Sequence, residues 1–73
     1  MTFGEVFQYY MEKVGMTQSD VARKMGTGRQ TINSIIKGGR RGPTLETALG
    51  IADALGVSLE DMVYMMKNDK PRE

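Results

Sequence analysis

The sequence contains no cysteine and no histidine among its 73 residues. The lack of cysteine excludes disulfides and thiolate metal sites, and the lack of histidine removes the commonest metal ligand and the usual general base. No apolar run approaches the roughly 18 residues of a membrane span, and the start MTFGEVF lacks the charged-then-apolar order of a signal peptide. We therefore expect a cytoplasmic chain with no metal, no cofactor and no membrane association.

Carboxylates are the remaining candidates for catalysis. Glu5, Glu12, Glu60 and Asp61 lie at predicted helix starts or on exposed faces, where capping and solubility account for them. A chain of 73 residues also allows only one domain with a modest core, which leaves little room for a deep cleft. We expect no enzymatic activity and no small-molecule substrate.

Acidic residues are absent from the middle of the chain. Between Val21 and Leu45 lie six basic residues and no acidic one, whereas the rest holds four basic and nine acidic residues, so that the formal net charge is only +1. This distribution predicts one cationic face that meets a polyanion. The alternative is a basic stretch that is merely solvated.

Regular start and stop signals predict five helices, over residues 2–14, 18–25, 29–37, 45–55 and 59–66. Four of them end at a glycine in the place of a left-handed cap: Gly15, Gly26, Gly38 and Gly56. The available N-terminal caps are Thr2, Thr17, Thr27, Thr44 and Ser58. These signals predict an all-α domain over residues 1–66 and a polar tail over 67–73.

Apolar residues at three- and four-residue steps predict the buried side of each helix. The predicted core consists of Val6, Phe7, Tyr10, Val14, Val21, Ala22, Met25, Ile32, Ile35, Ile36, Leu45, Ala48, Leu49, Ala52, Leu55, Leu59, Met62, Val63 and Met66. Because the shorter helices are unstable alone, all five are expected to pack around this one core.

The helices over 18–25 and 29–37 are separated by only Gly26, Thr27 and Gly28. A glycine-containing turn of this length is typical of a helix-turn-helix, with Ala22 at the closest approach of the two helices. The same hairpin also occurs in proteins that never touch nucleic acid. Either Thr27 or Gly28 caps the second helix.

The outer face of the 29–37 helix is polar and free of acidic groups. At roughly 100° per residue, Ile32 and Ile35 point inward, and the outward arc holds Arg29, Gln30, Asn33, Ser34 and Lys37. Arginine suits the paired acceptors of guanine, and glutamine or asparagine suits the edge of adenine, in the major groove of DNA. The alternative is an ordinary solvated face, in which Gln30 completes a capping box with Thr27.

The segment KGGRRGP, residues 37–43, follows this helix directly. Its glycines allow a close backbone approach, and Lys37, Arg40 and Arg41 can neutralise phosphates beside the groove. The alternative is a loop that only adds solubility.

Residues 16–63 resemble the phage repressor and Cro-type helix-turn-helix family, also called the xenobiotic-response-element type. The resemblance rests on TQSDVARKMG leading into TINSI, and on the later PTLETALGIADALGVSLEDM. It implies a compact, five-helix, lambda-repressor-like domain whose third helix lies in the major groove. The function implied is a sequence-specific double-stranded DNA-binding transcriptional regulator, most often a repressor, encoded by a bacterium or phage.

The resemblance also implies roles for individual residues. The base-contacting positions of the family fall on Arg29, Gln30 and Asn33, and its phosphate-holding glutamine falls on Gln18, at a helix N-terminus that favours an anion. The other backbone contacts expected are Thr17, Gly28, Thr31, Ser34, Lys37, Arg40 and Arg41.

Two positions depart from the family's pattern. Gly28 stands where members often carry a polar residue, and Met11 and Ile36 stand where many carry an Arg and a Glu that pair. Replacing both partners of a buried pair by apolar groups can be neutral or stabilising. We therefore expect Met11 to contact Ile36.

Tyr64 and Met65 lie off the predicted apolar stripe of their helix. We expect them, with Val57, to form a homodimer contact, so that two half-sites of a pseudo-palindromic operator are read together. Ordinary core packing by methionine is the alternative. A second function also remains open, an antitoxin or co-regulator whose main role is to bind a protein partner such as a toxin.

Overall fold

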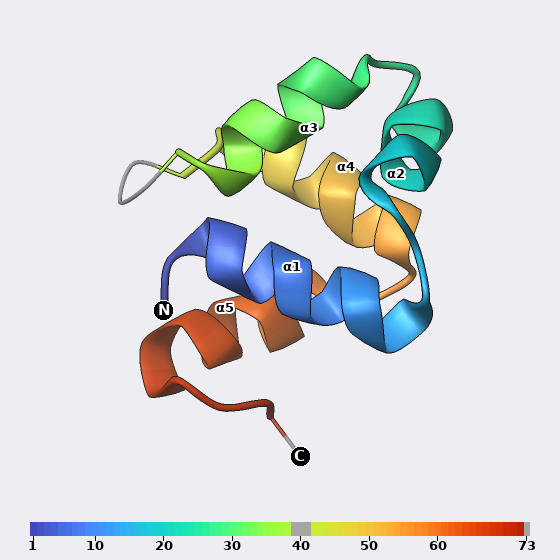
Figure 1. Cartoon of the computed structure of the whole chain (residues 1–73). Helices are drawn as coiled ribbons and strands as arrows, with labels where there is room; N and C mark the ends of the chain where they lie inside the picture. Colours follow the sequence, from blue (N-terminus) through green and yellow to red (C-terminus); the bar gives the residue numbers. More distant parts are fainter. Residues whose placement is uncertain (39–41, 73) are drawn as a thin grey trace.

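The computed structural model describes residues 1–38 and 42–72. Its helices are α1 (Phe3–Val14), α2 (Gln18–Met25), α3 (Arg29–Ile36), α4 (Leu45–Leu55) and α5 (Leu59–Asn68), and these described ranges contain no strand. In Figure 1, α2 and α3 lie at the top, α1 crosses the middle and α5 lies beneath it. The predicted all-α, five-helix architecture is confirmed.

Side-chain caps fix the starts of four helices. The Thr2 hydroxyl accepts from the Glu5 amide at 3.2 Å, and the Glu5 carboxylate accepts from the Thr2 amide at 2.9 Å. Thr17 and Asp20 form the same reciprocal pair, at 3.1 and 2.9 Å. Thr44 and Ser58 also accept from the amides three residues ahead. These polar pairs explain why the helices begin where the sequence predicts.

Three of the four predicted glycine stops are confirmed, since Gly15, Gly26 and Gly56 adopt left-handed backbone angles. The prediction for Gly38 was wrong. Helix α3 ends at Ile36, its C-cap Lys37 has φ −87°, and the Gly38 amide donates to the Ile35 carbonyl at 3.2 Å, so neither Lys37 nor Gly38 is a left-handed cap. Among the described residues of this connection, Gly42 is the one with a positive φ.

The core is formed mainly by the predicted residues. The buried apolar side chains are Phe3, Val6, Phe7, Tyr10, Met11, Val21, Ala22, Ile32, Ala48, Ile51, Ala52, Ala54, Leu55, Met62 and Met65. Partly buried side chains that pack against them include Met25, Ile35, Ile36, Leu59 and Met66. Met11 and Ile36 thus share one core, and their direct contact stays a prediction.

Four residues of the predicted core are exposed instead: Val14, Leu45, Leu49 and Val63. On α4 the buried side centres on Ile51, Ala52 and Leu55, because α4 packs against α1, α2 and α5. That rotation turns Leu45 and Leu49 toward solvent. On α5, Met62 and Met65 point inward, and Val63 lies outside the core.

Met65 corrects the predicted dimer contact. Its side chain is only 3% exposed and belongs to the core cluster. The sequence pattern placed it off the apolar stripe, but the packing of α5 on α1 and α4 buries the side that carries Met62 and Met65. Met65 therefore offers no free surface to a second copy.

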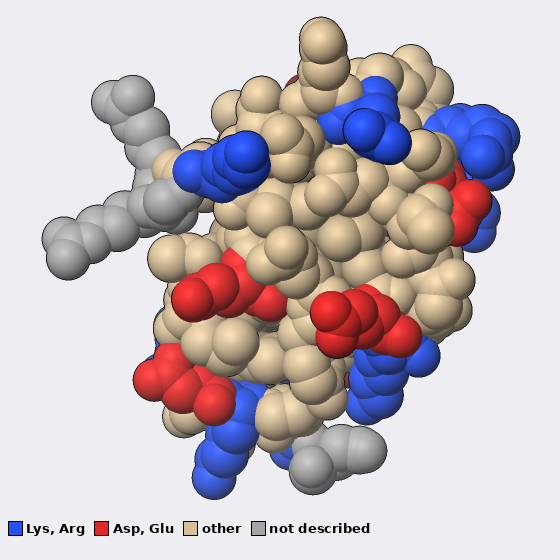
Figure 2. All heavy atoms as spheres, in the orientation of Figure 1, with Lys and Arg blue, Asp and Glu red and all other residues tan. Residues whose placement is uncertain are grey.

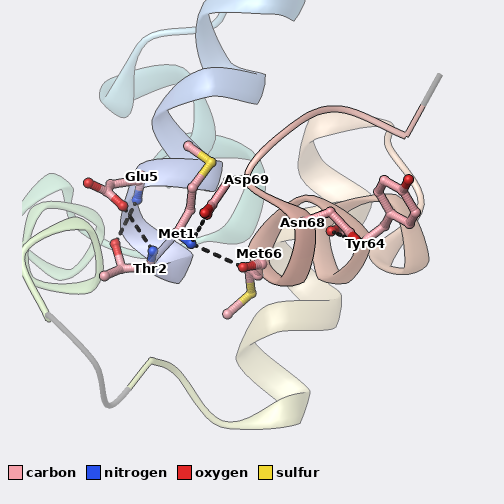
Figure 3. A network of polar contacts seen from close by, with 7 residues as sticks. All are labelled: Met1, Thr2, Glu5, Tyr64, Met66, Asn68 and Asp69. Carbon is pink, nitrogen blue, oxygen red and sulfur yellow. Dashed lines mark hydrogen bonds and ion pairs between the residues drawn. The ribbon is translucent and has the colours of Figure 1, made fainter.

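Helix α1 holds the two ends of the fold together. Gly4 is buried, and a Cβ placed on it would collide with the carbonyl oxygen of Ile36 at the end of α3. On the other side, the Met1 amine donates to the Met66 carbonyl at 3.0 Å and pairs with Asp69 beyond α5 (Figure 3). The start of α1 is thereby fixed against both α3 and α5.

Candidate nucleic-acid interface

The turn between α2 and α3 has the tight geometry predicted for a helix-turn-helix. Gly26 adopts φ 71°, its amide donates to the Arg23 carbonyl at 3.2 Å, and the Thr27 amide donates to the Ala22 carbonyl at 2.9 Å. Ala22 is buried, as expected for a residue at the closest approach of two helices. These bonds fix the direction in which α3 leaves the turn.

Helix α3 is oriented by Ile32, whose side chain is fully buried, while Ile35 and Ile36 are half-buried against the core. The opposite side is open to solvent, with Asn33 half-buried. We call this side the reading face; it carries Arg29, Gln30, Asn33, Ser34 and Lys37. The structure confirms the prediction that these residues lie on the side of the helix away from the core.

The starts of α2 and α3 meet at one shallow hollow of about 470 Å³. Its lining consists of Thr17, Gln18, Ser19, Arg29, Gln30 and Asn33. The structure thus brings the three predicted base-contacting residues together with Thr17 and Gln18, which lie eleven or more positions earlier in the sequence. Sequence reasoning missed Ser19, although its place beside Gln18 in the first turn of the same helix was a usable signal.

The remaining predicted DNA contacts divide into two groups. Thr31, Ser34 and Lys37 are exposed on α3 but do not line the hollow, and Gly28 lies at the start of α3. Arg40 and Arg41 lie outside the described residues. Exposed polar side chains therefore extend beyond the lining of the hollow along α3.

Helix α3 begins differently from the other four helices. Its N-cap is Gly28, with no side-chain cap hydrogen bond, which decides between Thr27 and Gly28 and removes the capping-box explanation of Gln30. The first amides of any helix have no partner within that helix. At α3 the Thr31 amide donates to the Gly28 carbonyl at 3.1 Å, and no bond from the Arg29 or Gln30 amide is found within the described residues. Those two amides and the positive end of the helix dipole are available to an anion.

The described basic residues around the hollow have different partners. Arg23 pairs with Asp20 at 3.3 Å, and the Lys24 ammonium donates to the Ala54 carbonyl at 3.4 Å. No ion pair to Arg29 or Lys37 is found within residues 1–38 and 42–72. Figure 2 shows basic side chains along the upper edge, over α2 and α3, and most acidic ones of this view lower down. Arg29 and Lys37 can therefore meet a phosphate or a base directly.

Asp20 is the one acidic group beside this surface on α2. Hydrogen bonds from the Thr17 amide and hydroxyl, and then the nearby Arg23 guanidinium, hold the pKa of its carboxyl below the usual 3.8. The carboxylate stays charged at neutral pH and secures the first turn of α2. It supports the hollow without lining it.

The structure adds two further observations. In the described part of the chain, no cluster of three or more acidic, histidine or cysteine side chains is arranged to hold a metal ion. None of the helices described combines the length and the apolar character that crossing a bilayer requires.

Comparison with known proteins identifies relatives along most of the chain. The sequence pattern of the helix-turn-helix family matches residues 7–62. An uncharacterized HTH-type transcriptional regulator of Methanocaldococcus jannaschii is 40% identical over 63 residues, which cover 86% of this chain and 92% of the relative. Another, from Sinorhizobium fredii, is 37% identical over 60 residues, 82% of this chain and 77% of the relative.

A third such regulator, from Archaeoglobus fulgidus, is 38% identical over 53 residues, 73% of this chain and 74% of the relative. The family consists of regulators rather than enzymes, so the expectation of no enzymatic activity is confirmed. With its five helices and its tight α2–α3 turn, the chain belongs to the helix-turn-helix family, in its Cro/C1 or xenobiotic-response-element type, whose members are DNA-binding transcriptional regulators.

Proposed function

We propose that this chain is a sequence-specific regulator that inserts α3 into the major groove of double-stranded DNA and represses transcription as a dimer on a pseudo-palindromic operator. The observation that carries the proposal is the hollow that gathers Gln18, Arg29, Gln30 and Asn33 at the starts of α2 and α3. It combines groups suited to base edges and groups suited to phosphates, and its lining contains no acidic residue.

The dimensions of α3 suit this role. An α-helix with its side chains is about 10–12 Å across, and the major groove is about 12 Å wide. The Arg29 guanidinium can donate to both acceptors of a guanine, whereas Gln30 and Asn33 can each donate to and accept from an adenine. We assign base contacts to these three residues.

Phosphate contacts flank the base-reading residues in this proposal. Thr17, Gln18 and Ser19 present hydroxyl and amide groups at the start of α2, close to the uncapped start of α3 at Gly28. The remaining phosphate contacts are assigned to Thr31, Ser34, Lys37, Arg40 and Arg41. Such contacts set the position of a protein on DNA, while base edges supply the specificity.

Selection of bound duplexes from a random pool tests the proposal. We expect one recurring motif with approximate twofold symmetry and half-sites roughly 34 Å apart, because each copy reads one half-site. When the selection is repeated at a higher salt concentration, all binding should weaken steeply, because Lys and Arg side chains that contact phosphates release counterions from the DNA. A pool that shows no enrichment over random sequence, at either salt concentration, would contradict the proposal.

A further inference from the structure

A second hollow lies at the C-terminal end of α1, away from the Gly4 contact. Its volume is about 740 Å³, compared with 470 Å³ for the hollow at the starts of α2 and α3. Four segments line it: the end of α1, the α4–α5 turn, the first turn of α5 and the tail that follows α5. In Figure 1 this tail turns back after α5 and runs beneath it. We call this space the tail hollow; its size is in the range of small-molecule sites, about 300–1,000 Å³.

The walls of the tail hollow include several apolar groups. Val14, Val57, Pro71 and Tyr10 belong to its lining. Helical periodicity predicts Val14 in the core, but it is 40% exposed, because it borders this open space. A Cβ placed on Gly56, in the same lining, would meet nothing within 4 Å. An apolar group that enters the hollow is therefore removed from water against more than one segment, which favours binding.

Two cationic side chains also line the tail hollow, Lys13 on α1 and Arg72 in the tail. In the described part of the chain no ion pair to Lys13 is found, and its ammonium lies 5.9 Å from the centre of the Tyr9 ring. Arg72 donates to the Asp61 carboxylate at 3.2 Å and lies 3.8 Å from a Glu60 oxygen. Both of these contacts use the same nitrogen, Nη1. The other guanidinium donors are left for a further acceptor.

We propose that the tail hollow binds a small organic carboxylate with an apolar body, such as an aromatic or branched-chain acid. The carboxylate accepts hydrogen bonds from Arg72 and Lys13, and the apolar body lies against Val14 and Val57. A guanidinium suits this role, because it can hold a carboxylate through two parallel hydrogen bonds. The contact with Asp61 already holds Arg72 at the hollow, which lowers the ordering cost of binding.

The lining favours this class of ligand over two others. Asp61 is the one acidic residue among those that line the tail hollow, and it pairs with Arg72, so a cationic ligand finds no free partner. An inorganic anion such as phosphate would leave the apolar walls in contact with water. A carboxylate with an apolar body uses both the cations and the walls.

The tail hollow is separate from the reading face. The residues that line it belong to α1, the α4–α5 turn, α5 and the tail, and none belongs to α2 or α3. A ligand in the tail hollow therefore leaves the DNA-binding surface free. The inference goes beyond the proposed function and does not depend on it.

Titration of the ¹⁵N-labelled whole chain with benzoate, followed by NMR, tests the proposal. The amide signals of Val14, Val57 and Ser58 should shift and saturate, whereas those of α3 should not move. We expect a dissociation constant on the order of 1 mM, because a ligand of so few atoms gains little binding free energy. Benzyl alcohol has the same ring without the charge and should bind at least about fivefold more weakly. Isovalerate, a branched acid, should shift the same signals.

Substitutions test each part of the site. Lys13→Gln and Arg72→Gln should each weaken benzoate binding about fivefold, and both side chains are exposed, so the fold should be retained. Lys70→Gln is the matched control, because it removes an exposed cation of the tail that does not line the hollow. Val14→Trp should fill the hollow and abolish binding. Val63→Trp, at a valine of α5 that is 39% exposed and outside the lining, should bind like the wild type.

Several results would overturn the proposal. These are the lack of a saturable shift with both benzoate and isovalerate, equal affinity for benzoate and benzyl alcohol, and wild-type affinity in Lys13→Gln and Val14→Trp. Shifts of the same amides that follow protein concentration and do not respond to either acid would assign the hollow to a second copy, and would also overturn it. Arg29→Ala should leave the benzoate titration unchanged, so this proposal and base reading by α3 fail separately.

Discussion

The α2–α3 half and the α4–α5 half of the molecule expose opposite kinds of side chain. Helix α3 and its C-cap Lys37 expose guanidinium, amide, hydroxyl and ammonium groups, whereas α4 and α5 expose two leucines and a valine. Both halves bury one side in the same core. The difference indicates that the first half is the one whose exposed groups suit a polyanion.

The two helices of the first half also begin differently. Thr17 and Asp20 close the start of α2 with two reciprocal hydrogen bonds, whereas Gly28 leaves the start of α3 without a side-chain cap. A capped start holds α2 in place, and an uncapped start leaves amides near the reading face for an external acceptor. The start of α2 thus contributes to stability, whereas the start of α3 leaves hydrogen-bond donors for a ligand.

The largest expected effect comes from substituting Gly4, at the contact between α1 and the end of α3. Gly4→Ala should destabilise the fold by about 3 kcal/mol, because its methyl group would meet backbone rather than a flexible side chain. Urea unfolding followed by circular dichroism measures the change. Gly50→Ala is the matched control within α4, where the nearest atom is the end of Met25 at 3.4 Å, and it should stabilise by roughly 0.5–1 kcal/mol. Equal effects of the two variants would show that α1 and α3 do not pack as described.

The next largest effect distinguishes base contacts from phosphate contacts in the α2–α3 half. Arg29→Ala should lose about 1–3 kcal/mol of discrimination at one base pair, because a paired contact to guanine disappears. Lys37→Ala should weaken binding to every duplex alike and reduce the salt dependence by about one counterion. Fluorescence anisotropy with the selected and a scrambled duplex measures both. Equal losses on the two duplexes for Arg29→Ala would remove it from base reading.

A smaller effect should come from the start of α2. Thr17→Ala removes a side-chain cap and should cost about 1 kcal/mol of stability, measured by urea unfolding at neutral pH. Thr44→Ala, at the start of α4 and away from the hollow, is a matched cap deletion and should cost a similar amount. If both lose stability but only Thr17→Ala also loses DNA affinity, the hollow binds DNA.

Asp20 makes the stability of the fold depend on pH, and the direction of its pKa shift sets the sign of that dependence. Its pKa is lower in the folded chain than its usual 3.8, so its charged form stabilises the fold above that value. The contribution is lost as the pH falls through the lower, folded-state pKa. The stability difference between wild type and Asp20→Asn should therefore be largest at neutral pH and shrink in acid. A difference that is constant from neutral pH to below the folded-state pKa would contradict this assignment.

The sequence alone predicts the α2–α3 half of this molecule better than the α4–α5 half. In α3 every outward position is polar and every inward one is isoleucine, so helical periodicity has one solution, and the structure agrees with it. In α4 and α5 apolar residues occur on both sides. Periodicity alone then cannot choose which side faces the core, and it assigned Leu45, Leu49 and Val63 to the interior and Met65 to the surface.

The features that sequence reasoning missed depend on contacts between distant segments. Gly4 is an ordinary early helical residue until α1 lies against the end of α3, 32 positions later in the sequence. Ser19 likewise joins Arg29 and Asn33 only because the α2–α3 turn folds back. Local signals, such as the N-caps Thr2 and Thr17, were predicted correctly because each hydroxyl and the amide that it accepts from lie in one turn of helix.

The smallest expected effect sharpens the difference between the capped α2 and the uncapped α3. Gly28→Ser should stabilise the fold by a few tenths of a kcal/mol, because a serine hydroxyl can accept from an amide of the first turn. The position tolerates a side chain, since its φ is −88° and a Cβ there meets nothing within 4 Å. Gly28→Ala is the control, since it adds the carbon without the acceptor and should lower stability by roughly 0.5 kcal/mol or more. If alanine and serine change the urea midpoint in the same direction, the start of α3 is not limited by a missing acceptor, and its contrast with α2 has another cause.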